Sequence, residues 1–108
     1  MKEIKINFNT EDGQAEFTTP VIDGKLDGLI ISSNCEVSII IQSSLGYSIF
    51  HNSRHKGIKY YAPRTVLQGP IKKLIVNDQF DNFILNESLS IIISGPKNQD
   101  VTVRLRID

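Results

Sequence analysis

The sequence predicts an all-β protein, and three observations lead to this prediction. Isoleucine occurs 17 times in 108 residues, whereas alanine, the best helix former, occurs twice. β-branched side chains lose rotamer freedom in helices but pack well on pleated sheets. Short stretches of extended-strand character recur along the chain and are separated by glycine, proline, asparagine and aspartate. We therefore expect strands joined by turns, within a single domain that spans residues 1–108.

The first two strands are expected near the N-terminus. Residues 2–8 alternate strictly between polar and apolar side chains. Asp12 and Gly13 follow as a turn signal, and residues 14–18 resume the extended pattern with Phe17 facing inward. These two segments therefore predict a hairpin.

The middle of the chain contains several shorter strand candidates. We expect strands at residues 29–32, 35–42, 47–51, 58–62, 71–77 and 83–85. Residues 52–57 are polar and end in glycine, so they predict a loop in which the histidines are solvated. The single cysteine, Cys35, begins a strand, and we expect it to be a buried thiol that acts as a small apolar side chain.

The last two strands have the clearest patterns. Residues 89–93 alternate, residues 95–100 form a polar turn, and residues 101–108 alternate again. Arg104 and Arg106 fall on the polar side of the final strand, which predicts one buried face and one charged face.

Together these elements predict an antiparallel β-sandwich of eight or nine short strands, either jelly-roll or immunoglobulin-like. Periodicity does not separate the two topologies. No helical stretch is long enough to connect parallel strands. No run of about 18 apolar residues exists, so we expect no membrane span. The charged, alternating N-terminus predicts a protein that is made and kept in the cytosol rather than secreted.

Motifs for chemistry are absent from the sequence. His51 and His55 lie four residues apart but in a loop pattern, and Arg54 beside them would repel a cation. No carboxylate occurs between Glu36 and Asp78, and no nucleophile-elbow motif is found. We therefore expect a non-enzymatic protein with no catalytic residues, no metal site and no cofactor.

The segment from residue 51 to residue 64 is the best candidate for a binding surface. It holds four of the twelve lysines and arginines, two adjacent tyrosines and no carboxylate. Arginine and tyrosine are enriched in protein interfaces, and adjacent strand residues point to opposite faces, so one tyrosine is expected in the core. The predicted partner-binding residues are Arg54, Lys56, Lys59, Tyr60, Tyr61 and Arg64.

Charge is segregated along the chain although its sum is zero. Residues 1–36 have a net charge of −4, residues 37–77 of +6 and residues 78–108 of −2. These blocks either compensate one another within the fold or form complementary surfaces through which copies of the chain associate head to tail. The second interpretation predicts a homo-oligomer.

Two other kinds of partner are weighed against protein partners. A cell-surface glycan is possible because Tyr47, Tyr60 and Tyr61 could form an aromatic platform, although tryptophan is absent. Nucleic acid is disfavoured because the chain has no net charge and a pI near 6.7, whereas nucleic-acid-binding domains are usually basic. A carbohydrate-binding module is therefore the alternative function.

Several stretches also carry a resemblance to a known class of protein. These are Val21-Ile22-Asp23-Gly24-Lys25, Gly46-Tyr47-Ser48-Ile49, Tyr60-Tyr61-Ala62-Pro63-Arg64, Ile91-Ile92-Ile93-Ser94-Gly95 and Val101-Thr102-Val103-Arg104-Leu105-Arg106. In its pattern of residues over most of the chain, the sequence resembles small virion structural proteins of tailed bacteriophages. The resemblance implies a compact β-sandwich in a capsid, neck or tail, without enzymatic activity. It also implies assembly in the host cytoplasm and contacts with copies of itself or other virion proteins.

Overall fold

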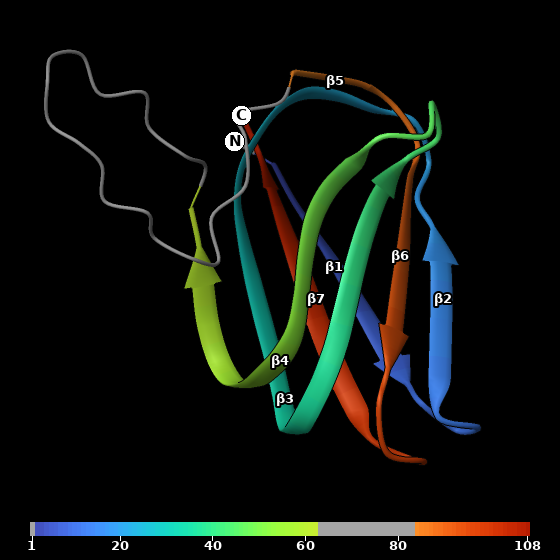
Figure 1. Cartoon of the computed structure of the whole chain (residues 1–108). Helices are drawn as coiled ribbons and strands as arrows, with labels where there is room; N and C mark the ends of the chain where they lie inside the picture. The colour runs from blue at the N-terminus through green and yellow to red at the C-terminus, as the bar shows by residue number, and fades with distance from the viewer. Residues whose placement is uncertain (1, 63–83) are drawn as a thin grey trace, which may run out of the picture.

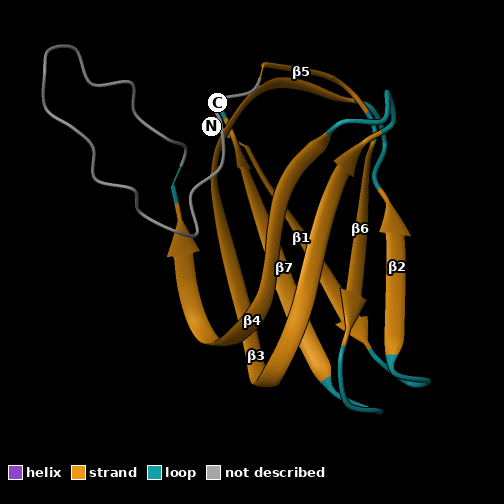
Figure 2. Ribbon diagram, viewed as in Figure 1, coloured by secondary structure: helices purple, strands orange, loops and turns teal. Residues whose placement is uncertain are grey.

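A computed structural model describes residues 2–62 and 84–108, and both ranges consist of strands joined by turns and loops (Figures 1 and 2). The strands are β1 (Lys2–Asn9), β2 (Gln14–Thr18), β3 (Ile22–Ser43), β4 (Ser48–Tyr61), β5 (Ile84–Glu87), β6 (Leu89–Ser94) and β7 (Asp100–Ile107). The all-β prediction is confirmed. The two described ranges contain no helix that could cross a membrane.

All strand pairs are antiparallel, and five strands follow one another in the order β1-β7-β3-β6-β2. The other two, β4 and β5, both pair with β3. The sheet curls into a half-barrel with β1 and β2 at the two ends of the strand order (Figure 1). These ends approach each other, because the ring of Phe8 on β1 meets the ring of Phe17 on β2 edge-on, with centroids 6.4 Å apart.

The curl depends on a bend in the 22-residue strand β3. Residues 26–33 of β3 pair with β7, and residues 38–43 pair with β6. β4 accompanies β3 along both arms, and the register shifts between Ser33 and Val37. On the β4 side of this shift, Gly57 has a φ of 85°, a conformation that is unstrained only for a residue without a side chain. The two strands therefore bend together.

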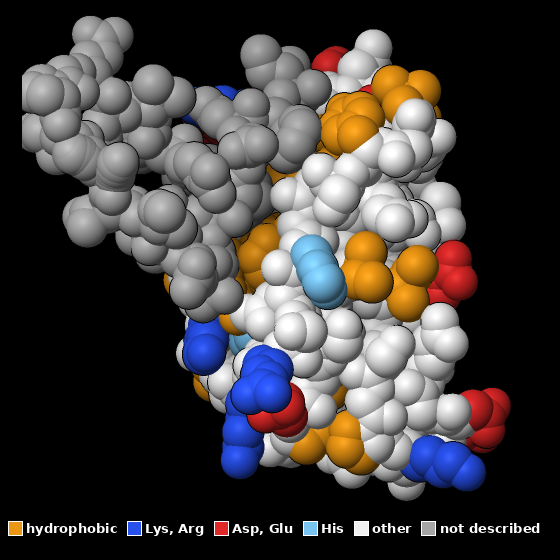
Figure 3. Space-filling model, viewed as in Figure 1, with side chains coloured by type: hydrophobic (Ala, Val, Ile, Leu, Met, Phe, Trp, Pro, Cys, Tyr) orange, Lys and Arg blue, Asp and Glu red, His pale blue; other side chains and the backbone are white. Residues whose placement is uncertain are grey.

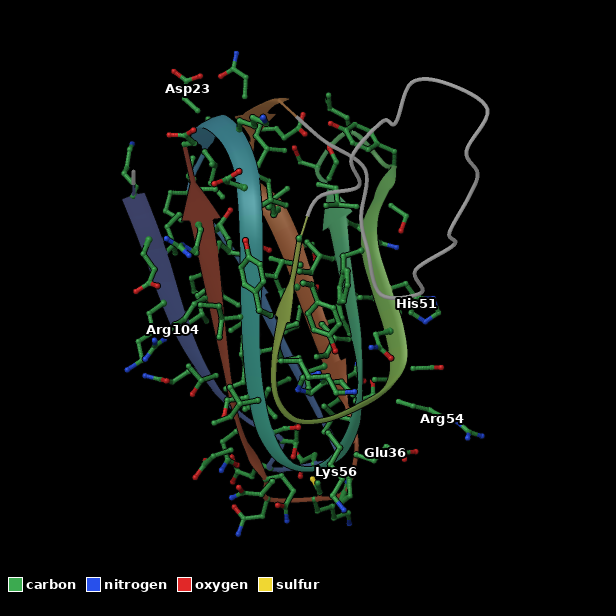
Figure 4. All side chains as sticks on the ribbon, turned by 90° about the vertical axis from the view of Figure 1, so that its left-hand side faces the viewer. Asp23, Glu36, His51, Arg54, Lys56 and Arg104 are labelled. Atoms are coloured by element: carbon green, nitrogen blue, oxygen red, sulfur yellow. The ribbon has the colours of Figure 1, made fainter. Side chains whose placement is uncertain are left out.

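The bend divides the sheet into two half-sheets. The first half-sheet contains β1, β7, the first arm of β3 and residues 57–61 of β4. The second contains β2, β6, the second arm of β3 and residues 48–55 of β4. In Figure 4, Arg104 of the first half-sheet and His51 of the second point away from the molecule on opposite sides. The inner surfaces of both half-sheets therefore enclose one core.

The core is built from the apolar faces that alternation predicts. Ile39 and Ile41 on β3 pair with Ile93 and Ile91 on β6, and all four side chains are fully buried. The final strand buries its alternate residues Val101, Val103, Leu105 and Ile107. Cys35 is half-buried against this core, so the expected small apolar role is only partly met.

The predicted hairpin between the first two strands is wrong. β1 pairs with β7 and β2 pairs with β6, so both strands find partners from the far end of the chain. The turn predicted at Asp12 and Gly13 is nevertheless present, because the N–H of Gly13 donates to the carbonyl oxygen of Thr10 at 3.0 Å. Phe17 is also more exposed than expected, at 39%. A turn motif predicts where the chain reverses its direction, but it does not predict which strands then pair with each other.

The strand count is also corrected, because the structure shows seven strands in the described ranges rather than eight or nine. The segments predicted separately at 29–32 and 35–42 both belong to β3, and those at 47–51 and 58–62 both belong to β4. Residues 52–57 are part of β4 rather than a loop. The strand predicted at 71–77 lies outside the described residues. The antiparallel all-β class is confirmed, and the jelly-roll or immunoglobulin-like sandwich stays a prediction.

Candidate functional site

The cations of the predicted binding segment that the structure describes lie along β4, at its bend and beyond it. Arg54 and Lys56 are exposed where β4 bends, and Lys59 is exposed beyond the bend. Figure 4 shows Arg54 pointing to the side opposite Arg104. Arg64 lies outside the described residues.

The two adjacent tyrosines have opposite environments, as the alternation of a strand requires. Tyr61 is 2% exposed and packs against Phe50, with ring centroids 4.8 Å apart. Tyr60 is 54% exposed on the other side of the strand. Tyr60 is therefore the tyrosine of this pair that can contact a partner, and Tyr61 is a core residue.

Tyr60 belongs to a continuous surface on the outside of the first half-sheet. One row of this surface crosses four strands in register: Lys5 of β1 is opposite Arg104 of β7, Arg104 is opposite Ile30 of β3, and Ile30 is opposite Tyr60 of β4. The row is charged at β1 and apolar at β4. We name this surface the outer face and define it by Lys5, Ile30, Ser32, Ile58, Tyr60, Thr102 and Arg104.

A neighbouring row adds the most exposed large apolar side chain in the described residues. Thr102, Ser32 and Ile58 stand opposite one another on β7, β3 and β4, and Ile58 is 78% exposed. Except for Tyr60, the residues of the outer face line a shallow groove of about 210 Å³. An isoleucine at the margin of a groove offers apolar area that only a second apolar surface can remove from water.

The ring of Tyr60 is held in place by a glycine on the neighbouring strand. A Cβ atom at Gly28 would lie 2.8 Å from both Cε1 and the hydroxyl oxygen of Tyr60, so the ring lies over the bare backbone of Gly28. The hydroxyl donates to the carbonyl oxygen of Asp27 at 3.3 Å. A half-exposed aromatic ring that is already ordered loses little conformational entropy when a partner covers it.

We expect Gly28→Ala to displace the Tyr60 ring while leaving the fold intact. The new methyl group would overlap the outer end of a flexible side chain, which can rotate away, rather than backbone. The aromatic NMR signals of Tyr60 should shift, with the melting temperature close to that of the wild type. Unchanged Tyr60 signals would show that the ring is not seated on Gly28.

The outer face and its margin carry an excess of positive charge. Lys5 and Arg104 lie opposite each other, and Arg106 lies opposite Glu3 one row further along. The side chains of Lys5 and Arg104 form no hydrogen bond or ion pair with another residue of the described ranges. The second half-sheet differs, because Figure 3 shows its outer side to be largely uncharged, with charged side chains at the margins and lower end.

A second polar cluster lies inside the fold, at the bend of β4. His55 is fully buried, which corrects the expectation that residues 52–57 form a solvated loop. Its Nε2 lies 2.8 Å from the carbonyl oxygen of Gly57, and its Nδ1 lies 2.6 Å from the hydroxyl of Tyr61. Asn52 donates from Nδ2 to the same hydroxyl at 3.0 Å. The carbonyl acceptor assigns the proton of a neutral imidazole to Nε2, so Tyr61 donates to Nδ1.

This cluster fits a structural role better than a catalytic one. Both ring nitrogens of His55 are engaged in the contacts that hold the bend together. His51 is exposed on the outside of the second half-sheet, so the structure does not bring the two histidines to one site. In the described part of the chain, no group of three or more His, Cys, Asp or Glu side chains could hold a metal ion.

A third polar contact joins the turn before β4 to the end of β5. The hydroxyl of Tyr47 donates to Oε1 of Glu87, whose side chain is buried. The pKa of the Tyr47 phenol is raised above its ordinary value, chiefly because this hydrogen bond to a carboxylate favours the neutral phenol. A hydrogen bond from the Ser43 side chain acts in the opposite direction.

We expect the Tyr47 phenol to ionise above the ordinary tyrosine pKa of about 10. Because the folded-state pKa is raised, the stabilisation from this contact is present below pH ~10 and is lost as pH rises through the folded-state pKa. Ultraviolet titrations of the wild type and Tyr47→Phe give the ionisation of this phenol by difference. A difference curve centred at or below the ordinary pKa would contradict the contact.

The sequence pointed to only part of the outer face. Tyr60 was predicted to bind a partner, and Arg104 was predicted only to lie on the charged face of the final strand. Arg104, Lys5, Ile30 and Ile58 were not assigned to the binding surface. The sequence of β4 does contain one sign of an exposed apolar surface. Alternation places Ile58 and Tyr60 on one face of the strand and Tyr61 on the other, so large side chains with apolar area occur on both faces. When only one face of such a strand packs on the core, the apolar side chains of the other face are exposed unless another segment or another protein covers them.

Comparison of the chain with protein-family models and with curated proteins finds no match in either.

Proposed function

We propose that this protein is a non-enzymatic structural component of a tailed-bacteriophage virion, acting as a capsid decoration, neck or tail protein. It works through protein–protein contacts made by the outer face. The resemblance of its sequence to small virion proteins supports the phage assignment. The bend of β3 and β4, which turns the two half-sheets toward a common core, supports a β-sandwich as the closer description of the fold.

The observation that carries this proposal is the joining of exposed apolar and cationic side chains on one flat sheet surface. Ile58 is 78% exposed and Tyr60 54% exposed, and the in-register row leads from Tyr60 to Arg104 and Lys5. Burying one isoleucine or aromatic side chain contributes about 1.5–3 kcal/mol, which a protein partner can supply. Aromatic residues and arginine are also the residue types that most often dominate binding energy in protein interfaces.

The carbohydrate alternative is less well supported by this surface. Sugar sites place carboxylate or amide side chains beside an aromatic ring to bind hydroxyl groups. Among the described residues, Ile30, Ile58 and Gly28 lie beside the ring of Tyr60, and none of these three offers a polar side chain. Tyr47 belongs to a different contact, with Glu87. The structure therefore gives no shared platform for the two exposed tyrosines.

The experiment that tests the proposal is incorporation of variants into particles. In the phage or prophage that carries the gene, we expect mass spectrometry of purified particles to detect the chain. Ile58→Asp should be depleted from the particles by about tenfold or more, since a buried unpaired carboxylate costs well over 1.4 kcal/mol. Leu45→Asp is the matched control, because Leu45 is 75% exposed on the turn before β4, outside the outer face.

Three outcomes would contradict the proposal. The chain could be absent from purified particles, or Ile58→Asp could be incorporated as well as Leu45→Asp. The third is binding of the purified protein to bacterial cell-wall glycans that is lost in Tyr47→Ala or Tyr60→Ala, which would favour the carbohydrate-binding module.

A further inference from the structure

The charge of the outer face limits what can cover it. Lys5 and Arg104 lie on the outer face, and Arg106 and Glu3 lie at its margin, so cations outnumber carboxylates there three to one. A surface with this excess does not complement itself, because two copies placed face to face bring like charges together. A partner must therefore present carboxylates, together with an apolar group for Ile58 and Tyr60.

The chain presents such a combination elsewhere, on two turns that lie together at the lower end of the molecule in Figure 1. These are the turns between β1 and β2 and between β6 and β7, and we name them the double turn. Its exposed side chains include Glu11, Asp12 and Pro96, with Lys97 as its one exposed cation, and the exposed Asp100 at the start of β7 adjoins it. The double turn therefore combines a net negative charge with an exposed apolar ring.

The double turn is held as one unit by Thr10, which is fully buried. The Thr10 hydroxyl donates to the carbonyl oxygen of Pro96 at 2.7 Å and accepts from the N–H of Gln99 at 2.9 Å. The Thr10 carbonyl accepts from the N–H groups of Gly13 at 3.0 Å and Asn98 at 2.6 Å. Because three of these four bonds cross between the two turns, the projection is ordered before it meets a partner, which limits the entropy lost on binding.

We propose that the outer face binds the double turn of a second copy of this chain, an inference that rests on the proposed protein-binding function. The carboxylates of Glu11 and Asp12 face Lys5 and Arg104, and the ring of Pro96 packs on the apolar side of the outer face. The two surfaces lie at different places on the chain, so the contact is heterologous. The pair of copies then retains one free outer face and one free double turn between them, so the contact can repeat into a ring or an open array.

This contact predicts an assembly that depends on concentration and salt. Light scattering after size-exclusion chromatography should give a mass that rises above the 12.1 kDa of one chain as concentration increases at low salt. High salt should return the mass toward one chain, because exposed charge pairs are screened. A wild-type protein that remains a single chain at every concentration and salt overturns this inference. In that case, the incorporation of Ile58→Asp and Leu45→Asp into particles still tests the proposed function separately.

Reversing the charge of each surface in turn tests whether the outer face and the double turn contact each other. One double variant, Lys5→Glu with Arg104→Glu, reverses the outer face, and another, Glu11→Lys with Asp12→Lys, reverses the double turn. Each alone should associate more weakly than the wild type by about tenfold or more, because like charges then face each other. An equimolar mixture should recover association, because each variant supplies the surface that complements the other.

The matched control is Arg54→Glu with Lys56→Glu, which makes the same change of charge at the bend of β4, on side chains that belong to neither surface. It should associate as the wild type does, and circular dichroism should show all three double variants to be folded. Association that survives reversal of the outer face overturns the inference, as does a mixture that fails to recover it. Retention of the wild type on DNA without self-association, lost in the Lys5→Glu, Arg104→Glu variant, would assign the outer face to nucleic acid instead.

Discussion

Truncation of Ile39 or Ile91 to alanine is expected to lower the free energy of unfolding by about 2–5 kcal/mol. Both side chains are fully buried, one on β3 and the other on β6, where the two strands pair side by side. Alanine removes apolar contacts and leaves a cavity that the rigid sheet cannot fully close. Urea denaturation of each variant, with the slope checked against the wild type, measures the effect.

Ile58→Ala is the control for these core truncations. It removes the same atoms from a side chain that is 78% exposed, so the free energy of unfolding should change by no more than about 0.5 kcal/mol. Wild-type stability of Ile39→Ala or Ile91→Ala would show that the inward faces of β3 and β6 are wrongly assigned. Equal losses in all three variants would show that Ile58 is covered within the isolated chain.

Replacing Tyr61 by phenylalanine is expected to destabilise the fold by about 1–3 kcal/mol, although the ring is retained. The hydroxyl both donates to Nδ1 of His55 and accepts from Nδ2 of Asn52. Its removal takes one hydrogen-bond partner from the buried Nδ1 of His55 and one from the half-buried Asn52, so both side chains lose a bond that offsets their desolvation. Thermal or urea unfolding measures the loss, with Tyr60→Phe as the matched control, because that hydroxyl is exposed and makes one long hydrogen bond.

A loss in Tyr61→Phe no larger than in Tyr60→Phe would show that the buried network at the bend contributes nothing to stability. The combined variant His55→Leu with Tyr61→Phe refines the measurement. If the two side chains act through their mutual contact, the effects of the single substitutions will not add.

Composition and alternation predicted the strand class, and alternation predicted most of the inward faces, although Phe17 is an exception. Ile39 and Ile41, like Val101 and Val103, lie on the buried face that a period of two assigns to them. These predictions succeed because the pattern is local: a strand with one apolar face has one stable orientation against a core.

The pairing of strands and the bend could not be read in the same way. β1 finds β7 at the other end of the chain, and no local pattern encodes such a partner. The segment around Gly57 contains polar residues that predict a loop, yet it continues β4 through a bend. Burial of His55 at that bend follows from the tertiary contacts with Tyr61 and Gly57, which sequence spacing does not reveal.

The outer face was missed as a unit for the same reason. Lys5, Ile30 and Tyr60 come from three segments that are distant in sequence and become neighbours only when β1, β7, β3 and β4 are in register. The charge blocks of the sequence left internal compensation and complementary surfaces both open, and they placed the basic surface in residues 37–77. Lys5 and Arg104 come instead from the two blocks with a net negative charge. In the structure, the two cations that line the groove beside Ile58 are Lys5 of β1 and Arg104 of β7.

The most direct test of the outer face as a protein-binding surface is site-specific photocrosslinking in purified particles. Ile58 and, in a separate variant, Leu45 would each be replaced by a photoreactive amino acid, since both positions are highly exposed in the isolated chain. We predict protein crosslinks from position 58 and none from position 45, with peptides that contain Glu11 and Asp12 among the products if a second copy is the partner. Crosslinks from position 45 and none from position 58, in particles that contain the chain, would contradict the account.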